Sequence, residues 1–301
     1  MELRHIRYFL AVAEEGNFTR AAAKLGIGQP PLSQQIRDLE TEIGTRLFRR
    51  LPQGAELTEA GRVFRAAVAP LPEAAQAAIA AARAAARGET GVLRLGLTGT
   101  AALNPAVQGL IRGFRTERPG VTLHLIEANS LRLREEVLAG HLDLAILRPS
   151  RSDPPDLVTR PLLSEPLVAV VSAGGDLPGT GPVSLRDLAG TPLILTPREM
   201  ALSLHDAAIA ACRAAGVEPR LGPAAPQIAT ILALVASGLG FSLVPASVEK
   251  LALEGVRYRH LQAPVPTVSI ALASRCGALP PAAAAFAASV PHAPEAAAPL
   301  A

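Results

Sequence analysis

A polar stripe near the N-terminus carries side chains that can hydrogen-bond to DNA. The apolar residues of this stretch recur at intervals of four, three and four, and are Leu32, Ile36, Leu39 and Ile43. At about 100° per residue they form one face of a helix. The opposite side carries Pro30, Gln34, Arg37 and Thr41, with Ser33 at its flank. Amide, hydroxyl and guanidinium groups bond base edges and phosphates, so the stretch predicts a helix that reads a major groove.

The segments on either side would position such a helix. A shorter amphipathic helix over 19–25 precedes it across a glycine turn and would cross the DNA backbone. Pro30 and Pro31 stand where a helix begins and where a missing N–H costs little. After the helix, Arg46, Arg49 and Arg50 lead into a turn at 51–54, which predicts a small wing with phosphate or minor-groove contacts. The alternative, a three-helix packing unit with a solvated polar face, stays open on these residues alone.

The composition bounds the class of protein. The chain has 301 residues, of which 49% are hydrophobic and 18% charged, and this composition predicts packed domains. At about 150 residues per domain, the length predicts two of them. The net charge of +3 is compatible with a nucleic-acid partner. The N-terminus lacks the apolar core of a signal peptide, so we expect a cytoplasmic protein without a membrane span. Cys212 and Cys276 fit no metal-ligand spacing, so we expect reduced packing cysteines, no metal and no cofactor.

A long helix should connect two domains. Thr58 is a good N-cap and Gly88 a good stop, which predicts a helix between them. A stripe of small residues would let two such helices pack closely, and it consists of Ala74, Ala77, Ala81 and Ala84. Pro70 and Pro72 each remove a backbone donor, so we expect a break or kink there.

Alternating strands and helices follow from residue 91. Apolar runs over 92–97, 121–126 and 142–147 alternate with helical patterns, and this βαβαβ order predicts a parallel sheet. Further strands are predicted over 167–171, 193–195, 241–244 and 268–273. Further helices are predicted over 203–215, 228–237 and 281–289.

Five runs stand in a specific order and spacing before position 62. They are 17–25 (NFTRAAAKL), 29–36 (QPPLSQQI), 39–40 (LE), 47–50 (LFRR) and 57–61 (LTEAG). This pattern resembles the signature of the LysR-type transcription regulators. The resemblance implies an N-terminal all-α winged helix-turn-helix at 1–58, a linker helix at 59–88 that dimerises, and an effector-binding domain at 91–301. That domain would be an α/β two-lobed domain of periplasmic-binding-protein type, with lobe I at 91–162 and 266–290 and lobe II at 163–265.

The resemblance also implies which residues contact DNA. The groove-facing set would be Gln29, Pro30, Pro31, Ser33, Gln34 and Arg37, while Thr19 would touch a phosphate and Arg49, Arg50 and Pro52 would belong to the wing. Position 34 holds Gln where many relatives place Arg. Glutamine prefers adenine and arginine prefers guanine, so the operator preference should differ from theirs.

A second set of residues would bind a small-molecule effector. The resemblance makes Thr98, Gly99 and Thr100 the first ligand loop, at the carboxyl end of a strand where open α/β sheets bind ligands. The other candidates are Ser130, Leu204, Gln227, Phe241 and Ser242. Leu204 stands where benzoate-, muconate- and chlorocatechol-responsive relatives often carry an aromatic residue. For each candidate a purely structural role as cap or turn stays open, and Asp143 is expected to be structural.

These observations favour a sequence-specific transcription regulator. Its partners would be double-stranded DNA, a small organic or aromatic carboxylate, and further copies of the chain as homodimer or homotetramer; RNA polymerase is a further partner of such regulators. Two other classes compete. An enzyme is disfavoured because the chain has no GxSxG, HExxH, P-loop or complete dinucleotide fingerprint. A transporter's solute-binding protein would match residues 91–290 but neither the N-terminal reader nor the missing export signal.

Overall fold

The computed structural model describes residues 1–52, 54–175 and 179–291. The chain divides into two compact units, Met1–Ala84 and Ala85–Ala301, and each is described by itself. Gln53 of the predicted wing turn and the predicted domain end at 301 lie outside the described residues. Among the described helices, none combines the length and the apolar character that crossing a bilayer requires.

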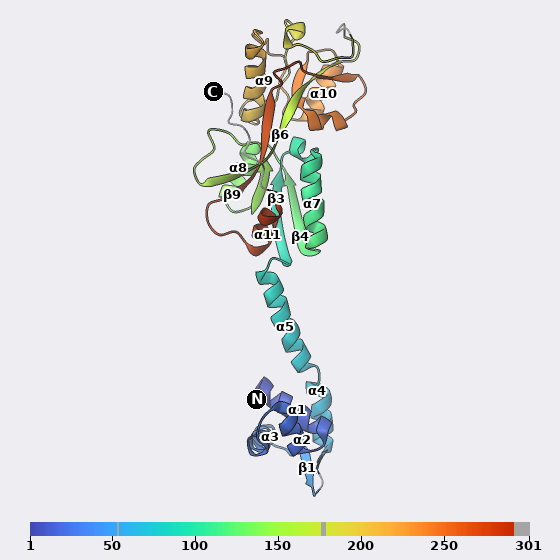
Figure 1. Cartoon of the computed structure of the whole chain (residues 1–301), viewed down its shortest axis with the longest axis vertical. Helices are drawn as coiled ribbons and strands as arrows, with labels where there is room; N and C mark the ends of the chain where they lie inside the picture. Colours follow the sequence, from blue (N-terminus) through green and yellow to red (C-terminus); the bar gives the residue numbers. More distant parts are fainter. Residues whose placement is uncertain (53, 176–178, 292–301) are drawn as a thin grey trace. The chain divides into compact units, whose positions relative to one another are not determined.

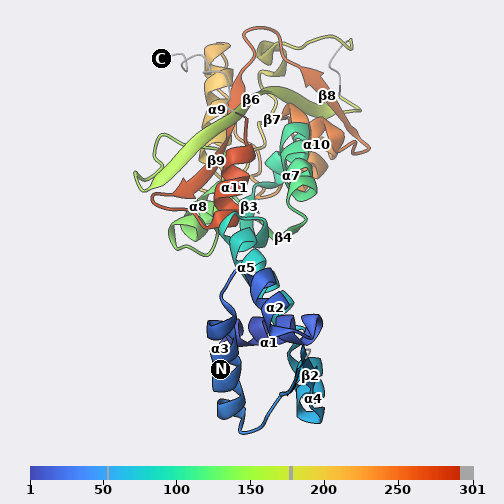
Figure 2. The same ribbon diagram turned by 60° about the horizontal axis from the view of Figure 1, so that its bottom comes forward.

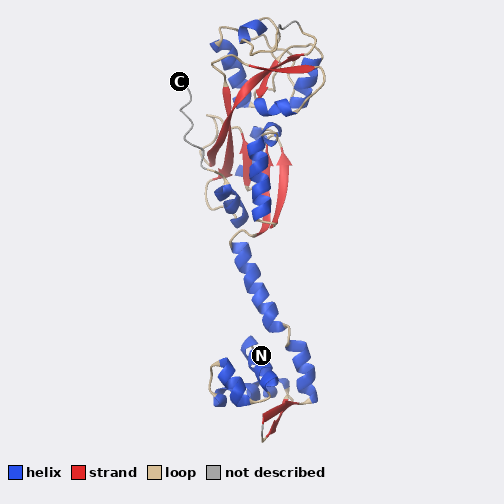
Figure 3. Ribbon diagram, turned by 45° about the vertical axis from the view of Figure 1, so that its right-hand side comes forward, coloured by secondary structure: helices blue, strands red, loops and turns tan. Residues whose placement is uncertain are grey.

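The N-terminal unit contains three helices, a β-hairpin and a fourth helix (Figure 3). The elements are α1 (Leu3–Glu15), α2 (Phe18–Leu25), α3 (Gln29–Ile43), β1 (Phe48–Leu51), β2 (Gly54–Leu57) and α4 (Glu59–Val68). Asn17 caps α2 by accepting hydrogen bonds from the amides of Thr19 and Arg20. The antiparallel pairing of β1 with β2 confirms the predicted wing.

One aromatic-centred core holds these elements together. The Phe9 ring lies 5.1 Å from that of Phe48 on the wing and 4.9 Å from that of Phe64 on α4. The predicted apolar face of α3 is confirmed for three positions, which are Leu32, Ile36 and Leu39, whereas Ile43 is exposed. Val68 of α4 is also buried in this core. A boundary at residue 58 would therefore separate α4 from the unit into which it packs.

The predicted linker helix is divided at the prolines. Helix α4 ends at Val68, and α5 (Leu71–Ala86) begins after a turn at Ala69 and Pro70. Pro70 has no N–H to donate to the preceding turn, while Pro72 lies in the first turn of α5, where a donor is not needed. The expected break is confirmed. None of the residues of α5 is buried in the isolated chain.

The second unit is built on a seven-stranded sheet in the order β4-β3-β5-β9-β6-β7, with β8 paired to β6. Its strands are β3 (Thr90–Leu97), β4 (Gly120–Glu127), β5 (Leu144–Leu147), β6 (Leu157–Ser172), β7 (Ser242–Pro245), β8 (Val256–His260) and β9 (Thr267–Arg275). The predicted parallel pairing holds for β3 with β4 and with β5. The remaining pairs are antiparallel, and the run at 193–195 forms only isolated bridges.

Strand β6 connects the two lobes. Up to Pro166 it pairs with β9, and from Leu167 onward it pairs with β7 and β8. Because one continuous strand serves both halves, a movement of lobe II relative to lobe I must bend or twist β6 and its partner β9. Figure 1 shows these two long strands running side by side between the lobes.

Helices cover both faces of the sheet (Figure 2). They are α6 (Gly99–Ala102), α7 (Pro105–Glu117), α8 (Ser130–Leu138), α9 (Leu202–Ala214), α10 (Ile228–Ala236) and α11 (Pro281–Ser289), with short 3-10 turns η1 (Leu185–Leu188) and η2 (Ala246–Lys250). On one face of lobe I, Phe114 of α7 meets Phe286 of α11 edge to face at 5.1 Å. Helix α8 packs through Leu133 and Val137 in a separate cluster with β5.

The two cysteines have different environments. Cys212 is buried in lobe II, and burial raises the pKa of its thiol, as expected for an inert packing residue. Cys276 is a free, exposed cysteine, so the prediction that it packs in a core is wrong. It follows β9, whose buried residues end at Ala273.

Candidate functional site

Helix α3 presents most of the predicted polar stripe to solvent. Gln29, Pro30, Pro31, Gln34 and Arg37 are all exposed. The helix begins with prolines in its first turn, as the missing N–H groups allow, and ends at a left-handed Gly44. The described part of this unit therefore exposes a mostly polar surface on one side of α3.

Ser33 does not belong to that surface. Its exposed fraction is 3%, so the prediction of a groove-facing hydroxyl is wrong. It follows Leu32 and precedes Ile36 by one turn, so the small side chain lies at the margin of the apolar face and is covered by the core. Its hydroxyl instead accepts a hydrogen bond of 2.9 Å from Gln29 Nε2. Ser33 thus holds the Gln29 amide rather than facing outward itself.

Arg37 is fixed by its neighbours on the helix. Its Nη2 donates to Gln34 Oε1 at 2.6 Å, and Gln34 Nε2 donates to Asp38 Oδ1 at 2.7 Å. Both polar atoms of the Gln34 amide are therefore used within the helix. Arg37 keeps further N–H donors on its planar guanidinium, which suits bidentate recognition of guanine or phosphate.

A buried carboxylate joins this helix to the wing, and sequence reasoning missed it. Glu40, on the buried side of α3, accepts hydrogen bonds from the amides of Leu47 and Phe48 at 2.8 and 3.0 Å. Those amides open β1, so Glu40 fixes the wing relative to α3. The sequence did contain a sign of this role: Glu40 directly follows the apolar Leu39 and is a charged residue beside the otherwise apolar face of α3.

The wing exposes the predicted arginines. Arg49, Arg50 and Pro52 are all exposed. Arg49 pairs with Glu56 across the hairpin at 2.7 Å, and the Arg50 guanidinium lies 5.0 Å from the centre of the Phe18 ring. Thr19 is also exposed, in the first turn of α2. Both arginines lie at the surface, where a polyanion can reach them.

A cavity of about 370 Å³ opens in the second unit at the carboxyl ends of β3 and β4. Six predicted effector-binding residues line it, which are Thr98, Gly99, Thr100, Ser130, Leu204 and Gln227. They come from both lobes, so the structure brings them together as expected. A cavity of this size can enclose a small organic molecule.

Two predicted effector residues lie elsewhere. Ser242 is buried, and its hydroxyl donates to the Ile194 carbonyl at 2.7 Å. Phe241 is buried in the core of lobe II. Both predictions are wrong. The glycine turn before them directs β7 into the sheet rather than toward the cavity, and each side chain satisfies packing within lobe II.

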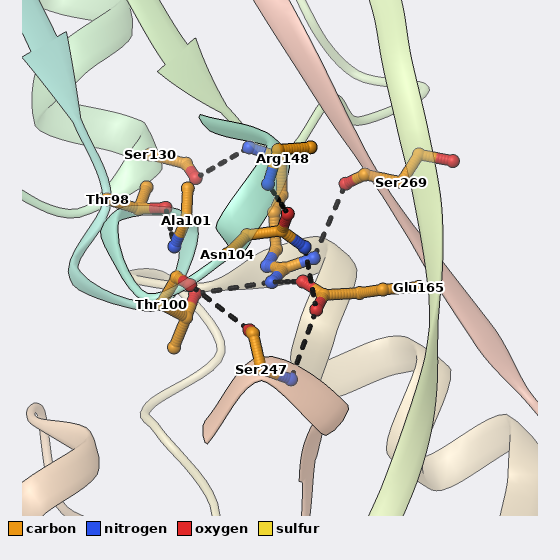
Figure 4. Close-up of polar contacts among 10 residues, drawn as sticks. Thr98, Thr100, Ala101, Asn104, Ser130, Arg148, Glu165, Ser247 and Ser269 are labelled. Atoms are coloured by element: carbon orange, nitrogen blue, oxygen red, sulfur yellow. Dashed lines mark hydrogen bonds and ion pairs between the residues drawn. The ribbon is translucent and has the colours of Figure 1, made fainter. Parts of the chain in front are cut away.

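Three hydroxyls of the cavity are oriented by bonds that they accept. Thr98 Oγ1 accepts from the Ala101 amide, and Ser130 Oγ accepts from the Arg148 amide, each at 3.4 Å (Figure 4). Thr100 Oγ1 accepts from Arg148 Nη2 at 3.3 Å. A hydroxyl that already accepts one bond keeps its hydrogen for an acceptor on a ligand. The cluster is therefore a set of donors.

A buried ion pair lies behind these hydroxyls. Arg148 Nη2 and Glu165 Oε1 are 2.6 Å apart, with side-chain exposures of only 5% and 6%. Burial lowers the pKa of Arg148, and the bond to Glu165 opposes that shift. Glu165 Oε2 also accepts from Asn104 Nδ2 and from the Ser247 amide, both at 3.3 Å. The pair thus joins the end of β5 to β6, and through Glu165 it also holds Asn104 of lobe I and the η2 turn of lobe II.

Arg148 was not predicted, although a signal for it existed. It directly follows Leu147, the last residue of β5, and so occupies the same edge of the sheet as Thr98 after β3. Asp143, expected to be structural, accepts from the amide of Arg94 at 2.8 Å and pairs with its guanidinium, which confirms that role.

Comparisons with known proteins match both units. The family described as "Bacterial regulatory helix-turn-helix protein, lysR family" matches residues 3–62, and the "LysR substrate binding domain" matches residues 86–293. The regulator BudR of Raoultella terrigena is 38% identical over 91% of this chain and 95% of its own length. The regulator IlvR of Caulobacter vibrioides is 41% identical over 88% of this chain and 89% of its own.

Solved structures agree. A crystal structure of CbnR, a LysR family transcriptional regulator, superposes with a TM-score of 0.85 at 32% identity, covering 97% of this chain and all of the other. Full-length CbnR complexed with its target DNA gives 0.83 at 31% identity, covering 96% and 98%. These findings exclude the enzyme and the transporter component considered from sequence. The chain belongs to the LysR family and is a DNA-binding transcription regulator with an effector-binding domain.

Proposed function

We propose that α3 enters the major groove of an operator with its exposed polar stripe toward the bases. Gln29, Pro30, Pro31, Gln34 and Arg37 would face the groove, with Arg37 as the main base reader because its guanidinium keeps N–H donors besides the one bonded to Gln34. Thr19 would meet a phosphate, and Arg49, Arg50 and Pro52 would carry the wing along the backbone or minor groove. The observation that supports this assignment is the exposure of the stripe on a helix whose opposite face is buried through Leu32, Ile36 and Leu39.

We propose that the cavity binds a small organic carboxylate as effector. The observation that carries this assignment is the set of three hydroxyls on Thr98, Thr100 and Ser130, which all accept protein hydrogen bonds and retain their hydrogens. A carboxylate has only acceptors at neutral pH, so it complements them. The chemistry is binding alone, with no covalent step.

Ligand binding would act by shifting a population of lobe arrangements. Hydrogen bonds already join the lobes at the cavity: Ser247 Oγ donates to the Thr100 carbonyl at 3.3 Å, and Ser203 Oγ donates to the Pro149 carbonyl. A ligand held by both lobes favours the arrangement that fits it. In a cytoplasmic homodimer formed through α5, or a homotetramer formed through the sensing domains as well, that change would alter how paired readers hold DNA.

Operator binding by the full chain tests the proposal. DNA that binds the protein is selected from a random pool, and affinities are measured by fluorescence anisotropy at one fixed salt concentration. Arg37→Ala should weaken binding with the fold intact, and Thr100→Val should leave ligand-free DNA binding unchanged while shifting the dose-response to an organic acid. Unchanged DNA binding by Arg37→Ala would contradict the reader assignment.

A further inference from the structure

We infer that the cavity selects monocarboxylates that carry an amino or hydroxyl group on the carbon next to the carboxylate, and that Glu127 makes this selection. The inference rests on the proposed carboxylate site and names the class of acid that the site takes. It follows from the charges that line the cavity and from the place of Glu127 among them.

The cations of the cavity are already neutralised. Arg148 is paired with Glu165 at 2.6 Å, and Arg134 is paired with Asp153 at 2.7 Å. Glu127, the last residue of β4, also lines the cavity, and within the described ranges it has no cation within ion-pair distance. The charged groups around the cavity therefore leave one uncompensated negative charge, which lies on Glu127.

Glu127 lies directly beside the hydroxyl cluster. Its Oε1 is 2.6 Å from the point where a Cβ on Gly99 would stand, so the end of this exposed side chain rests against the Gly99 backbone. Gly99 separates Thr98 from Thr100, two of the three hydroxyl donors. A strong acceptor at the end of β4 and two hydroxyl donors that follow β3 thus lie next to each other at the same edge of the sheet.

A ligand must satisfy both features with neighbouring groups. Its carboxylate would take the hydroxyl hydrogens, and a donor on the adjacent carbon would bond to Glu127, as in 2-amino and 2-hydroxy acids. A second carboxylate would meet Glu127 and be repelled, because the cavity offers no free cation to balance it. The remaining wall includes Met200, Leu204 and Ile228 and, among the described lining residues, no aromatic side chain, which suits an aliphatic substituent.

Four acids of equal chain length test the inference on the full-length protein. Butanoate, 2-aminobutanoate, 2-hydroxybutanoate and succinate are titrated by calorimetry, with ligand-induced thermal shifts as a second readout. We expect the amino and hydroxy acids to bind about threefold more tightly than butanoate, and succinate to bind more weakly than butanoate. Succinate binding as tightly as 2-aminobutanoate would overturn the inference.

Two variants locate the effect at Glu127. Glu127→Gln should remove the preference for 2-aminobutanoate and improve succinate binding by about threefold, because the exposed charge is screened by water, whereas butanoate binding should hardly change. Gly99→Ala keeps the charge but displaces the carboxylate, and should reduce the same preference. Glu135→Gln, on the exposed side of α8, is the matched control and should change nothing.

The outcomes separate the inference from the proposed function. If all four acids bind the wild type with one affinity, or if Glu127→Gln leaves their ratios unchanged, the inference is wrong and the carboxylate site stands. If none of the four binds the wild type, the carboxylate site is wrong and the inference falls with it.

Discussion

The DNA-reading surface and the effector cavity use polar residues in opposite ways. On α3 the polar stripe comes from one helix, is exposed, and is held by bonds between neighbouring turns, as between Gln34 and Arg37. In the cavity the polar groups come from segments that follow the strands of lobe I and from helix starts of lobe II, and the central pair of Arg148 and Glu165 is buried. The polar groups of a surface that binds a large polyanion can stay hydrated until the DNA arrives, whereas a pocket for a small acid must hold its donors in place before the ligand arrives.

The same contrast holds for the energetics of their ion pairs. The exposed pair of Arg49 and Glu56 on the wing should contribute less than about 1 kcal/mol, because water screens both charges. Removing one partner of the buried pair leaves a charge that has lost its water and its counter-ion. Mutations in the two regions should therefore differ in kind: those in the reader change affinity, and those behind the cavity change stability.

The largest effect is expected from Glu165→Ala. The substitution leaves the Arg148 guanidinium buried without its counter-ion and removes the acceptor of Asn104 and of the Ser247 amide. The second unit should therefore lose about 3–5 kcal/mol of stability. Urea denaturation of the full chain checks this. Glu56→Ala, which breaks the exposed pair on the wing, serves as the matched control. If both variants lose the same small amount of stability, the buried and the exposed ion pair do not differ in energy as we expect.

The next effect is expected from Arg37→Ala at the reader. Loss of one bidentate base contact should reduce operator affinity by about 1–3 kcal/mol without altering thermal stability. Arg112→Ala removes the same charge from an exposed position on α7 and should leave affinity nearly unchanged. If the two variants lose affinity equally, the effect is one of net charge and Arg37 is not a reader.

Glu40→Leu probes the buried carboxylate of the reading unit. Two buried amides, those of Leu47 and Phe48, would lose their acceptor at a cost of about 1–3 kcal/mol. We expect faster hydrogen exchange at β1 and a lower melting temperature, with Glu40→Gln, which keeps one acceptor oxygen, close to wild type. Unaltered exchange at β1 would show that other contacts fix the wing.

The smallest effect is expected from Thr100→Val in the cavity. Loss of one hydroxyl donor should weaken binding of an organic acid by about 1 kcal/mol, while DNA affinity without ligand stays the same. Calorimetry with 2-hydroxybutanoate measures the change. A variant that binds the acid as well as wild type would remove Thr100 from the site.

The sequence predicted the reader better than the cavity, for a physical reason. Helical periodicity alone separates Leu32 and Ile36 from Gln34 and Arg37, because all four lie on one element. It failed at Ser33, since a side chain at the margin of an apolar face is buried or exposed according to what packs over it.

The cavity depends on long-range packing. Residues at the ends of parallel strands, such as Thr98, could be predicted because those ends must meet at one edge of the sheet. Phe241 could not be placed, because β7 pairs with the antiparallel β6 and its direction is set by that pairing. Arg148 needed the partner Glu165, seventeen residues later on the strand that links the lobes, to be recognised as buried.

Hydrogen exchange of the full chain, with and without selected operator DNA, tests the central assignment most directly. We expect slower exchange in peptides covering residues 19–37 and 48–57, where α2, α3 and the wing lie, and little change in those covering α7. Unchanged exchange over residues 29–37 in a sample that binds the DNA would contradict it.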